Sequence, residues 1–372
     1  MERIDRRLAQ HVDWALALLA VLVVALGSTT VYSATFSQAD GQPSPLFYRQ
    51  LAWAGLGVGG MVVTLCFDYR KLERYAYLLY GAAVALLAMV PIVGIIGGGS
   101  RRWIHLGVFA LQPSELMKLS LVIVLAHFFQ TEGTRETYRL RDLAVPTVLY
   151  SVPAVLILAQ PDLGSALLLG FVFASMVVVA GIRLRSLLYL VVVGSIAVFV
   201  AGNALWGHLK PYQQKRIVTF LNPEADPLGS GYHIIQSEIA VGSGKVWGKG
   251  FLKGTQNKLN FLPEQHTDFI FSVYAEEWGF GGCVVLMLLY LALVWRGLEV
   301  VARAKERFGA LLAFGVTAIV FWQAFINMAM AMGMVPVVGI TLPLFSYGGS
   351  SMMTLLIGLA LLLNVSMRRF MF

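Results

Sequence analysis

A short polar stretch, Pro263 to Phe271 (PEQHTDFIF), stands at the edge of an apolar segment and has side chains suited to chemistry. Its aspartate, Asp268, can accept a proton from a sugar hydroxyl if it stays ionised at the membrane edge. Alternatively, Asp268 only caps the following helix beside Thr267, because helix N-termini favour carboxylates. Glu264 and His266 alternate with Asp268 at i, i+2 and i+4, a weak pattern for ligands of a hard divalent cation. The stretch therefore leaves a helix cap, a general base and a metal site open as interpretations.

Other charged side chains lie inside or beside apolar segments. Glu115 and Lys118 are three residues apart and share a helical face, which suits either a functional pair or a neutralising internal ion pair. Asp162 lies in a tight turn between two apolar segments, where it either belongs to a site or caps the next helix. On a helix, Glu276 is rotated by about 80° from Asp268, so we expect it to face a neighbouring helix rather than the same ligand.

The segment 207–267 is long, glycine-rich and basic. Its glycines permit unusual backbone angles and a close approach to a ligand. Its cations include Arg216, Lys245 and Lys249, which suit a pocket for anionic headgroups or a general attraction to a lipid surface. Both interpretations stay open from the composition alone.

Residues 232–240 (YHIIQSEIA) have the pattern of a short helix lying in the membrane interface. Ile235 and Ile239 share one helical face and Gln236 lies on another, as in amphipathic interfacial helices. We expect Gln236 and the nearby Ser243 to contact the same headgroup as the basic residues.

Near the C-terminus, a turn of small residues precedes an apolar segment. It consists of Ser346, Tyr347, Gly348, Gly349 and Ser350. Free backbone N–H groups at such a helix start can bind an anion. The alternative is an ordinary turn that binds no ligand.

The composition defines the class of protein that must position these residues. Of 372 residues, 58% are hydrophobic and 13% are charged, and apolar runs long enough to cross about 30 Å of hydrocarbon recur along the chain. We predict an all-α polytopic membrane protein, a single domain of ten transmembrane helices with a large extracytoplasmic loop, 207–267, between helices 7 and 8. The predicted spans are 13–34, 51–67, 75–97, 113–130, 143–160, 164–181, 187–206, 268–295, 308–333 and 350–367.

The distribution of lysine and arginine predicts the orientation. Outside the long loop these residues concentrate on the side of the N-terminus, whereas the short loops opposite carry Arg49, Arg101 and Arg102. Cytoplasmic loops are enriched in such residues, so we expect both termini in the cytoplasm and PEQHTDFIF on the outer side of the membrane. The N-terminus shows no small-residue cleavage signature, so the first helix is expected to be retained. Cys66 and Cys283 lie in apolar runs and are expected to pack rather than to pair.

Neither nucleotide nor nucleic acid is expected as a ligand. The net charge of +8 is explained by basic loops that face lipid headgroups. The segment GSGKVWGKG (242–250) lacks the spacing of a phosphate-binding P-loop and lies on the outer side. A reaction there needs a substrate that is already activated, such as a lipid diphosphate.

Five separated segments together resemble one protein family. In order, they are RRWIHLGVFALQPSELMK, QPDLGSA, DPLGSGYHIIQSEIAVGSG, LPEQHTDFIF and VPVVGITLPLFSYGGSS. They look like the SEDS (shape, elongation, division, sporulation) polymerases over nearly the whole chain, and closer to the elongation branch than to the division branch. Two residues depart from the family pattern: His105 replaces an acidic residue, and Trp278 replaces a more usual leucine.

The resemblance implies a ten-helix peptidoglycan glycosyltransferase that polymerises lipid II at the outer face of the inner membrane during cell elongation. It implies that Asp268 is the essential residue, deprotonating the acceptor 4-hydroxyl in one inverting displacement, and that Glu115, Lys118 and Asp162 belong to the site. A divalent cation, Mg²⁺ or Mn²⁺, is implied as a cofactor. The implied partners are a class B penicillin-binding protein, lipid II, membrane lipids and the elongation machinery.

Two other functions stay open from the sequence. A flippase for lipid-linked precursors would also have many spans and intramembrane charges, although we see no clear internal repeat. A scaffold that only recruits a transpeptidase is the other alternative. Polymer made in detergent would favour the enzyme, and lipid translocation without polymer would favour the flippase.

Overall fold

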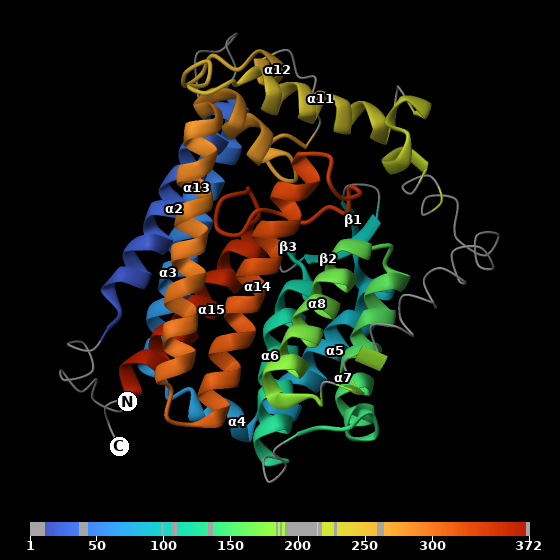
Figure 1. The fold of residues 1–372 in the computed structure, drawn as a ribbon, viewed down its shortest axis with the longest axis vertical. Helices are drawn as coiled ribbons and strands as arrows, with labels where there is room; N and C mark the ends of the chain where they lie inside the picture. The colour runs from blue at the N-terminus through green and yellow to red at the C-terminus, as the bar shows by residue number, and fades with distance from the viewer. Residues whose placement is uncertain are drawn as a thin grey trace.

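The computed structural model describes residues 12–36, 44–97, 100–105, 107, 110–132, 137–183, 185–186, 188–189, 214, 218–226, 229–258 and 264–369. Within these ranges the chain is mostly helical, and its long helices run along one bundle (Figure 1). The predicted span 187–206 and the candidate Arg216 fall almost entirely outside the described residues.

Every other predicted span coincides with a long helix. These helices are α2 (Trp14–Thr35), α3 (Pro45–Cys66), α5 (Ala76–Val93), α6 (Pro113–Thr131), α7 (Ala144–Ala159), α8 (Leu163–Gly181), α13 (Ile270–Arg303), α14 (Arg307–Ala331) and α15 (Gly349–Arg368). Within the described ranges, seven helices are long and apolar enough to cross a membrane. The protein is therefore a multi-pass membrane protein.

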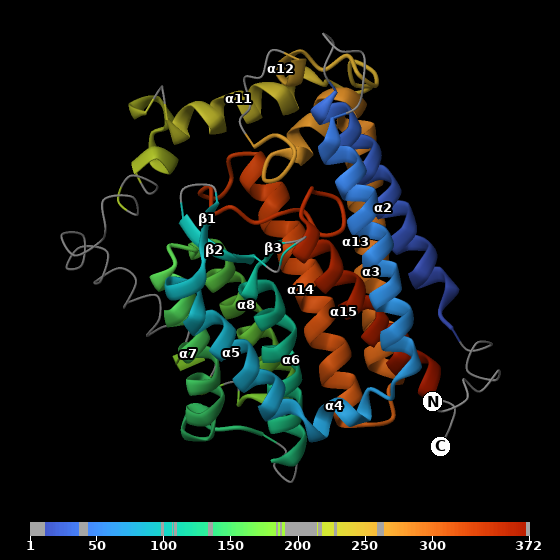
Figure 2. The ribbon, with the colours of Figure 1, turned by 180° about the vertical axis from the view of Figure 1, so that it is seen from behind.

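The two ends of the bundle carry different elements. Helices α11 (Ser230–Ser243) and α12 (Thr255–Lys258), with the short η3 (Pro223–Ala225), lie across one end, which we call the loop end (Figure 1). Helix α4 (Arg70–Arg74) lies at the opposite end, the α4 end, where α2 begins and α15 finishes (Figure 2). Helix α8 ends at Gly181, whose carbonyl oxygen accepts a hydrogen bond from the backbone N–H of Tyr138, just before η1 (Leu140–Leu143).

Helices α14 and α15 form the centre of the bundle. In their most apolar stretches, 72% and 83% of residues are buried, against 39% in α2 and 22% in α5. Helix α14 packs against α6 and α8 on one side and against α13 and α15 on the other, and the rear view shows it between these two groups (Figure 2). Peripheral side chains such as Leu78 and Val155 are apolar and exposed, as expected for a surface that contacts lipid.

A small antiparallel sheet at the loop end corrects the all-α prediction. Its strands are β1 (Ile95–Gly97), β2 (Ser100–His105) and β3 (Ala110–Leu111), in that order. Helix α5 ends at Val93, and Gly94 adopts an extended conformation in which an added Cβ would lie 2.3 Å from the carbonyl oxygen of Val90. Because the chain turns here, the apolar run predicted as a span to residue 97 leaves the helix before the run ends.

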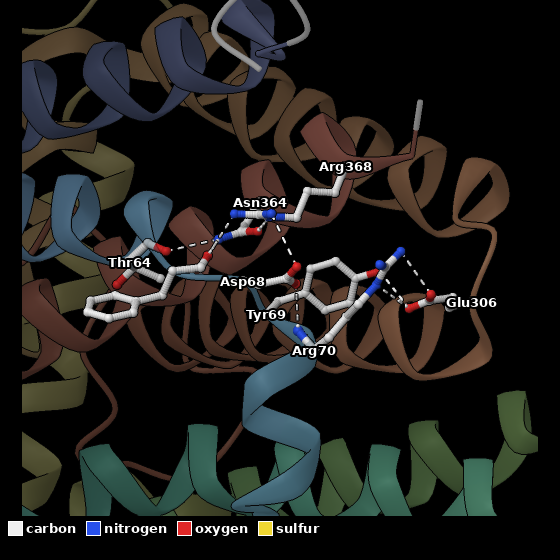
Figure 3. A network of polar contacts seen from close by, with 8 residues as sticks. Thr64, Asp68, Tyr69, Arg70, Glu306, Asn364 and Arg368 are labelled. Atoms are coloured by element: carbon white, nitrogen blue, oxygen red, sulfur yellow. Dashed lines mark hydrogen bonds and ion pairs between the residues drawn. The ribbon is translucent and has the colours of Figure 1, made fainter. Parts of the chain in front are cut away.

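Amide and charged side chains join α3 to α15 at the α4 end (Figure 3). Asn364 donates through Nδ2 to the carbonyl oxygens of Thr64 (2.9 Å) and Phe67 (2.6 Å). Arg368 donates to Oδ1 of Asn364 (2.8 Å) and pairs with Asp68 (3.2 Å). The contacts satisfy carbonyls at the C-terminal end of α3, where intrahelical partners run out.

A second charged contact at the α4 end ties α4 to the start of α14 (Figure 3). Glu306 pairs with Arg70 at 2.9 Å and accepts a hydrogen bond from Oη of Tyr69 at 3.1 Å. Burial, and then the charge of Glu306, raise the pKa of Tyr69 to about 12. The phenol therefore stays protonated and donates to Glu306 at neutral pH.

Candidate active site

Asp268 lies in a turn, Glu264–Phe269, that leads into α13 at the loop end. The helix begins at Ile270 with Phe269 at the N-cap position, and phenylalanine has no side-chain oxygen to cap with. The prediction that Thr267 caps this helix is wrong, since its hydroxyl donates to the carbonyl oxygen of Glu264 at 3.1 Å. Asp268 is half-buried and lies outside the helical residues.

A buried asparagine that the sequence analysis missed fixes the backbone of this turn. Nδ2 of Asn327, on α14, donates to the carbonyl oxygens of Asp268 (2.9 Å) and Ile340 (2.7 Å). Its side chain is fully buried. A polar amide in the middle of the apolar span 308–333 was the available signal, because such side chains usually bond across helices in a membrane.

Gly339 brings the segment after α14 close to the Asp268 carboxylate. Its φ is +74°, and an added Cβ would lie 3.4 Å from Oδ2 of Asp268. Glycine adopts this backbone conformation without the steric cost that a side chain brings. The residue therefore combines a left-handed turn with a close approach to the candidate base.

The predicted small-residue turn packs directly on the Asp268 turn. Oγ of Ser346 donates to the carbonyl oxygen of Thr267 (2.7 Å), and the backbone N–H of Tyr347 donates to that of His266 (2.9 Å). The prediction that α15 starts here is confirmed, because the helix begins at Gly349 with Gly348 as its N-cap residue. The two sequence motifs thus form one unit, although about 80 residues separate them.

Ser350 connects this unit to the start of α6. Its Oγ donates to the carbonyl oxygen of Ala110 (3.0 Å) and accepts from the N–H of Gln112 (3.2 Å). Gly349 lies against Trp53, where an added Cβ would be 2.3 Å from the ring. These close contacts leave little freedom at the start of α15.

Glu115 and Lys118 form a buried ion pair in the first turns of α6. Nζ of Lys118 lies 2.7 Å from Oε2 of Glu115, and their side chains are 3% and 8% exposed. The predicted shared face and internal pairing are therefore confirmed. Each charge is compensated by the other, as buried ions require, and a role in substrate binding stays a prediction.

Asp162 is the N-cap residue of α8, as one of the two alternatives predicted. Its carboxylate accepts from the N–H (3.1 Å) and the hydroxyl (2.8 Å) of Ser165. Nε2 of Gln112 lies 3.4 Å from Oδ2 of Asp162, and Arg102 lies 3.9 Å from Oδ1. Through Gln112, Asp162 joins the same continuous set of contacts as Ser350.

The predicted interfacial helix exists as α11, but a different face is buried. Ile234, Ser237 and Ala240 face the protein, whereas Ile239 is 45% exposed. Ser237 bonds to the hydroxyl of Ser272 and to the carbonyl oxygen of Ala331, both at 2.6 Å. Helix α11 is thus attached to α13 and α14 rather than only resting on lipid.

The other candidates of the loop have different surroundings. Lys245 is exposed and Gln236 is half-buried. The hydroxyl of Ser243 donates to the carbonyl oxygen of Ala240, inside its own helix, at 2.9 Å. Nζ of Lys249 lies 2.6 Å from Glu276. The expectation that Glu276 faces a neighbouring helix holds for the short α12 of the loop rather than for a spanning helix, because Glu276 accepts hydrogen bonds from Thr255 and Gln256 as well as from Lys249.

The described residues do not build a metal cage. Within the described ranges, no group of three or more His, Cys, Asp or Glu side chains is placed to hold an ion. Oε2 of Glu264 accepts from Thr267 (3.1 Å), and the His266 ring lies 5.7 Å from that of Tyr347. Burial lowers the pKa of His266 against the opposing charge of Glu264, so the ring is neutral at pH 7. The two predicted ligands turn to different neighbours, which does not fit a shared cation.

Together the fold and site define a multi-pass helical membrane protein with a half-buried carboxylate at one end of the bundle. The chain belongs to the FtsW/RodA/SpoVE family of cell cycle proteins, whose model matches residues 13–370. The predicted SEDS resemblance is thereby confirmed.

Relatives match the chain from end to end. It is 38% identical over 360 residues to the peptidoglycan glycosyltransferase MrdB of Escherichia coli (strain K12), covering 96% of this chain and 94% of MrdB. It is 38% identical over 359 residues to the stage V sporulation protein E of Bacillus subtilis (strain 168), covering 95% of this chain and 96% of that protein.

Solved structures share the fold. A structure described as "Structural coordination of polymerization and crosslinking by a peptidoglycan synthase complex" matches with a TM-score of 0.82 and 37% identity, covering 96% of this chain and 98% of that chain. The crystal structure of the rod shape determining protein RodA of Thermus thermophilus matches with a TM-score of 0.71 and 35% identity, with the same coverage of 96% and 98%. The predicted likeness to the elongation branch is confirmed by these matches.

Proposed function

We propose that this protein is a peptidoglycan glycosyltransferase that polymerises lipid II during cell elongation. Family membership and the activity named for MrdB support this proposal. The observation that carries it is the Asp268 carboxylate, held at the loop end by a turn whose backbone is bound to buried Asn327.

In the proposed reaction, Asp268 acts as general base on the acceptor sugar. The 4-hydroxyl oxygen attacks the anomeric carbon of the donor, and its proton passes to the carboxylate. The bond from that carbon to the diphosphate breaks, and the lipid diphosphate leaves with the electron pair. A single displacement of this kind inverts the anomeric configuration. Fixing the turn keeps the base in one position, which lowers the entropic cost of the step.

The developing charge of the leaving diphosphate needs cationic partners, and such electrostatic stabilisation is commonly the larger catalytic contribution. Lys118 is a candidate because Glu115 holds its ammonium group in one orientation. Exposed Lys245 is a second candidate from the loop, and Arg216 is a third from the sequence. Asp162, Gln236, Ser243 and the Ser346–Ser350 turn are proposed to surround the substrate.

The loop end is proposed to face the outside of the inner membrane, with both termini in the cytoplasm. Basic residues such as Lys71, Arg74 and Arg303 lie at the α4 end, which agrees with the enrichment of lysine and arginine in cytoplasmic loops. A class B penicillin-binding protein is the proposed partner. It is supported by the similarity to a synthase complex that coordinates polymerisation with crosslinking.

The test uses purified protein in detergent, with lipid II, Mg²⁺ and the partner where required. A divalent cation is included because the resemblance implies one, and no step above depends on it. Asp268→Asn should lower polymer formation by about 100-fold or more, the size expected for loss of a general base. Glu264→Gln, in the same turn, is the matched control and should retain most activity. Near-normal polymer from folded Asp268→Asn would contradict the role of the base, and lipid translocation without polymer by the wild type would contradict the function.

A further inference from the structure

Helix α13 is broken at Gly279, nine residues after its first residue, Ile270. This glycine has φ +65° and ψ −165°, which interrupts the helical hydrogen bonds around it. The loop segment Gly244–Gln256 supplies the missing partners from its own backbone. These bonds run from Phe280 N to Lys245 O (2.8 Å), Gly281 N to Val246 O (3.0 Å), Lys249 N to Glu276 O (3.0 Å) and Gly250 N to Glu277 O (2.9 Å). The break is therefore a docking site for the loop rather than a defect of the helix.

Glycines make this backbone contact close. Gly248 has φ +74°, and an added Cβ would lie 2.1 Å from the carbonyl oxygen of Glu277. At Gly279 an added Cβ would lie 2.3 Å from the backbone nitrogen of Gly248. Neither position accepts a side chain without separating the loop from α13.

Two consecutive glutamates add side-chain contacts to the same loop segment. Glu276 is fully buried, and its Oε1 accepts from Nζ of Lys249 (2.6 Å), from Oγ1 (3.0 Å) and N (2.8 Å) of Thr255, and from N of Gln256 (3.2 Å). Glu277, also buried, accepts from the N–H of Leu252 at 3.1 Å and from the hydroxyl of Ser33 on α2. The two carboxylates thus bind the loop segment at Lys249, Leu252, Thr255 and Gln256.

The docked segment is continuous with α11, which packs beside the Asp268 turn. Ala240 of α11 and Phe269, the neighbour of Asp268, are buried in one small apolar cluster with Val337. Ser237 fixes the same helix to Ser272 on α13. A displacement of the loop segment would therefore reach the residue next to the candidate base.

We propose that Glu276 and Glu277 are positioning residues that clamp the segment Gly244–Gln256 into the break of α13 and thereby hold α11 against the Asp268 turn. Lys249 belongs to this clamp, because its ammonium group is bound to Glu276, and it is not a ligand of the substrate diphosphate. The inference rests on the proposed function only where it concerns catalysis, since the clamp itself is a property of the fold.

Hydrogen–deuterium exchange on the full chain in nanodiscs tests the clamp without any activity. Glu276→Gln should speed exchange in 244–256 by about tenfold or more, because local opening sets the exchange rate of a docked segment. Gly248→Ala should do the same, whereas Gly250→Ala is the matched control. Gly250 also has a positive φ (+100°), but an added Cβ would meet only the flexible side chain of Lys253, at 3.4 Å.

Kinetics on lipid II then separate positioning from substrate binding. Loss of positioning should lower kcat by about tenfold to 100-fold, since misplacement by about 1 Å has effects of this size, and should change KM by less than about threefold. Loss of a ligand that binds the diphosphate equally in the ground and transition states should chiefly raise KM. Loss of a ligand of the developing charge should lower kcat but leave the exchange of 244–256 unchanged. Glu276→Asp should recover part of kcat, and the effects of Glu276→Gln and Lys249→Gln should not add in the double variant, because the two side chains act as one unit.

Three results would overturn the clamp. The first is an unchanged exchange rate of 244–256 in Glu276→Gln, and the second is an equal exchange rate in Gly248→Ala and Gly250→Ala. The third is a Lys249→Gln variant that has a raised KM and a loop still protected from exchange, and whose kinetic effect adds to that of Glu276→Gln. If Glu276→Gln leaves too little folded protein because Lys249 loses its partner, the double variant and Gly248→Ala carry the test. A wild type without polymerase activity would count against the proposed function, while the exchange experiment would still decide the clamp.

Discussion

The Asp268 turn and the α4 end are held together by different sets of contacts, although each also uses an asparagine that binds backbone carbonyls. At the α4 end, charged side chains pair across helices, as in Arg70–Glu306 and Arg368–Asp68. At the Asp268 turn, neutral side chains bind backbone carbonyls, as Asn327 and Ser346 do. Neutral contacts fix the backbone of the turn without placing a further charge beside the Asp268 carboxylate. The difference separates a part of the molecule that only has to stay closed from a part that, in the proposed function, also has to hold the base.

Asn327 and Asn364 are matched probes of this difference. Each donates through Nδ2 to two backbone carbonyls, at the loop end and at the α4 end respectively. Replacing Asn327 by leucine removes the donor of both carbonyls that it binds, at a cost of about 1–3 kcal/mol for each buried group. Replacing Asn364 removes two hydrogen bonds and the acceptor of Arg368, although the carbonyls of Thr64 and Phe67 keep bonds from the Phe67 N–H (3.3 Å) and from Arg368 (3.3 Å). Both variants should therefore lower the unfolding temperature in detergent. Only Asn327→Leu should also reduce polymer formation per folded molecule, by about tenfold or more, because only it releases the Asp268 turn.

Equal activity losses in the two asparagine variants, at equal amounts of folded protein, would show that the two ends are not functionally distinct. An Asn327→Leu variant with normal activity would mean that the backbone hydrogen bond does not position Asp268.

Gly339→Ala should have an intermediate effect. Alanine at φ +74° costs about 1–2 kcal/mol, and its Cβ would lie 3.4 Å from Oδ2 of Asp268. Gly107→Ala is the control, because its φ is +78° and no atom lies within 4 Å of an added Cβ. Both variants should lose similar stability in thermal unfolding. If only Gly339→Ala lowers the polymerisation rate, the loss comes from the methyl group beside the Asp268 carboxylate. If both variants have the same rate, Gly339 does not contribute to the site.

Glu306→Gln should have the smallest effect. The Arg70–Glu306 pair is 31% and 38% exposed, and exposed pairs contribute about 0–1 kcal/mol, less at high salt. We expect a slightly lower unfolding temperature, a difference that shrinks as salt is added, and an unchanged polymerisation rate. A rate that falls with this substitution would connect the α4 end to catalysis and weaken the comparison.

The apolar periodicity of the chain predicts the helices well and their starts less well. Helix α3 begins at Pro45, six residues before the predicted 51, because Ser44 accepts a hydrogen bond from Leu46 (3.3 Å) and proline suits the first helical position. Arg49 and Gln50 follow the first turn of this helix and interrupt the apolar run, so hydropathy alone places the start after them. Strand β1 is missed for the opposite reason, since its residues are apolar but not helical.

The candidate site could be predicted as a set of motifs but not as a contact map. The pair Glu115–Lys118 follows from helical spacing, and the structure confirms it at 2.7 Å. The contact of Ser346 with Thr267 joins residues 79 apart in sequence, and no local pattern encodes it. Glu276 was placed relative to Asp268 as if both lay on one helix, whereas Asp268 lies in the turn before Ile270, and the partners of Glu276 are Lys249 and the start of α12.

The central position of α15 determines when the protein can be completed. Helix α3, near the start of the chain, packs mainly against α15, and the fully buried Gln50 donates to the carbonyl oxygen of Ser346 across 296 positions. During synthesis, the first hairpin must therefore wait in the bilayer, with an amide lacking this partner, until the last helix leaves the ribosome. A chain that stops before α15 lacks both this hydrogen-bond partner and the helix against which α3 mainly packs.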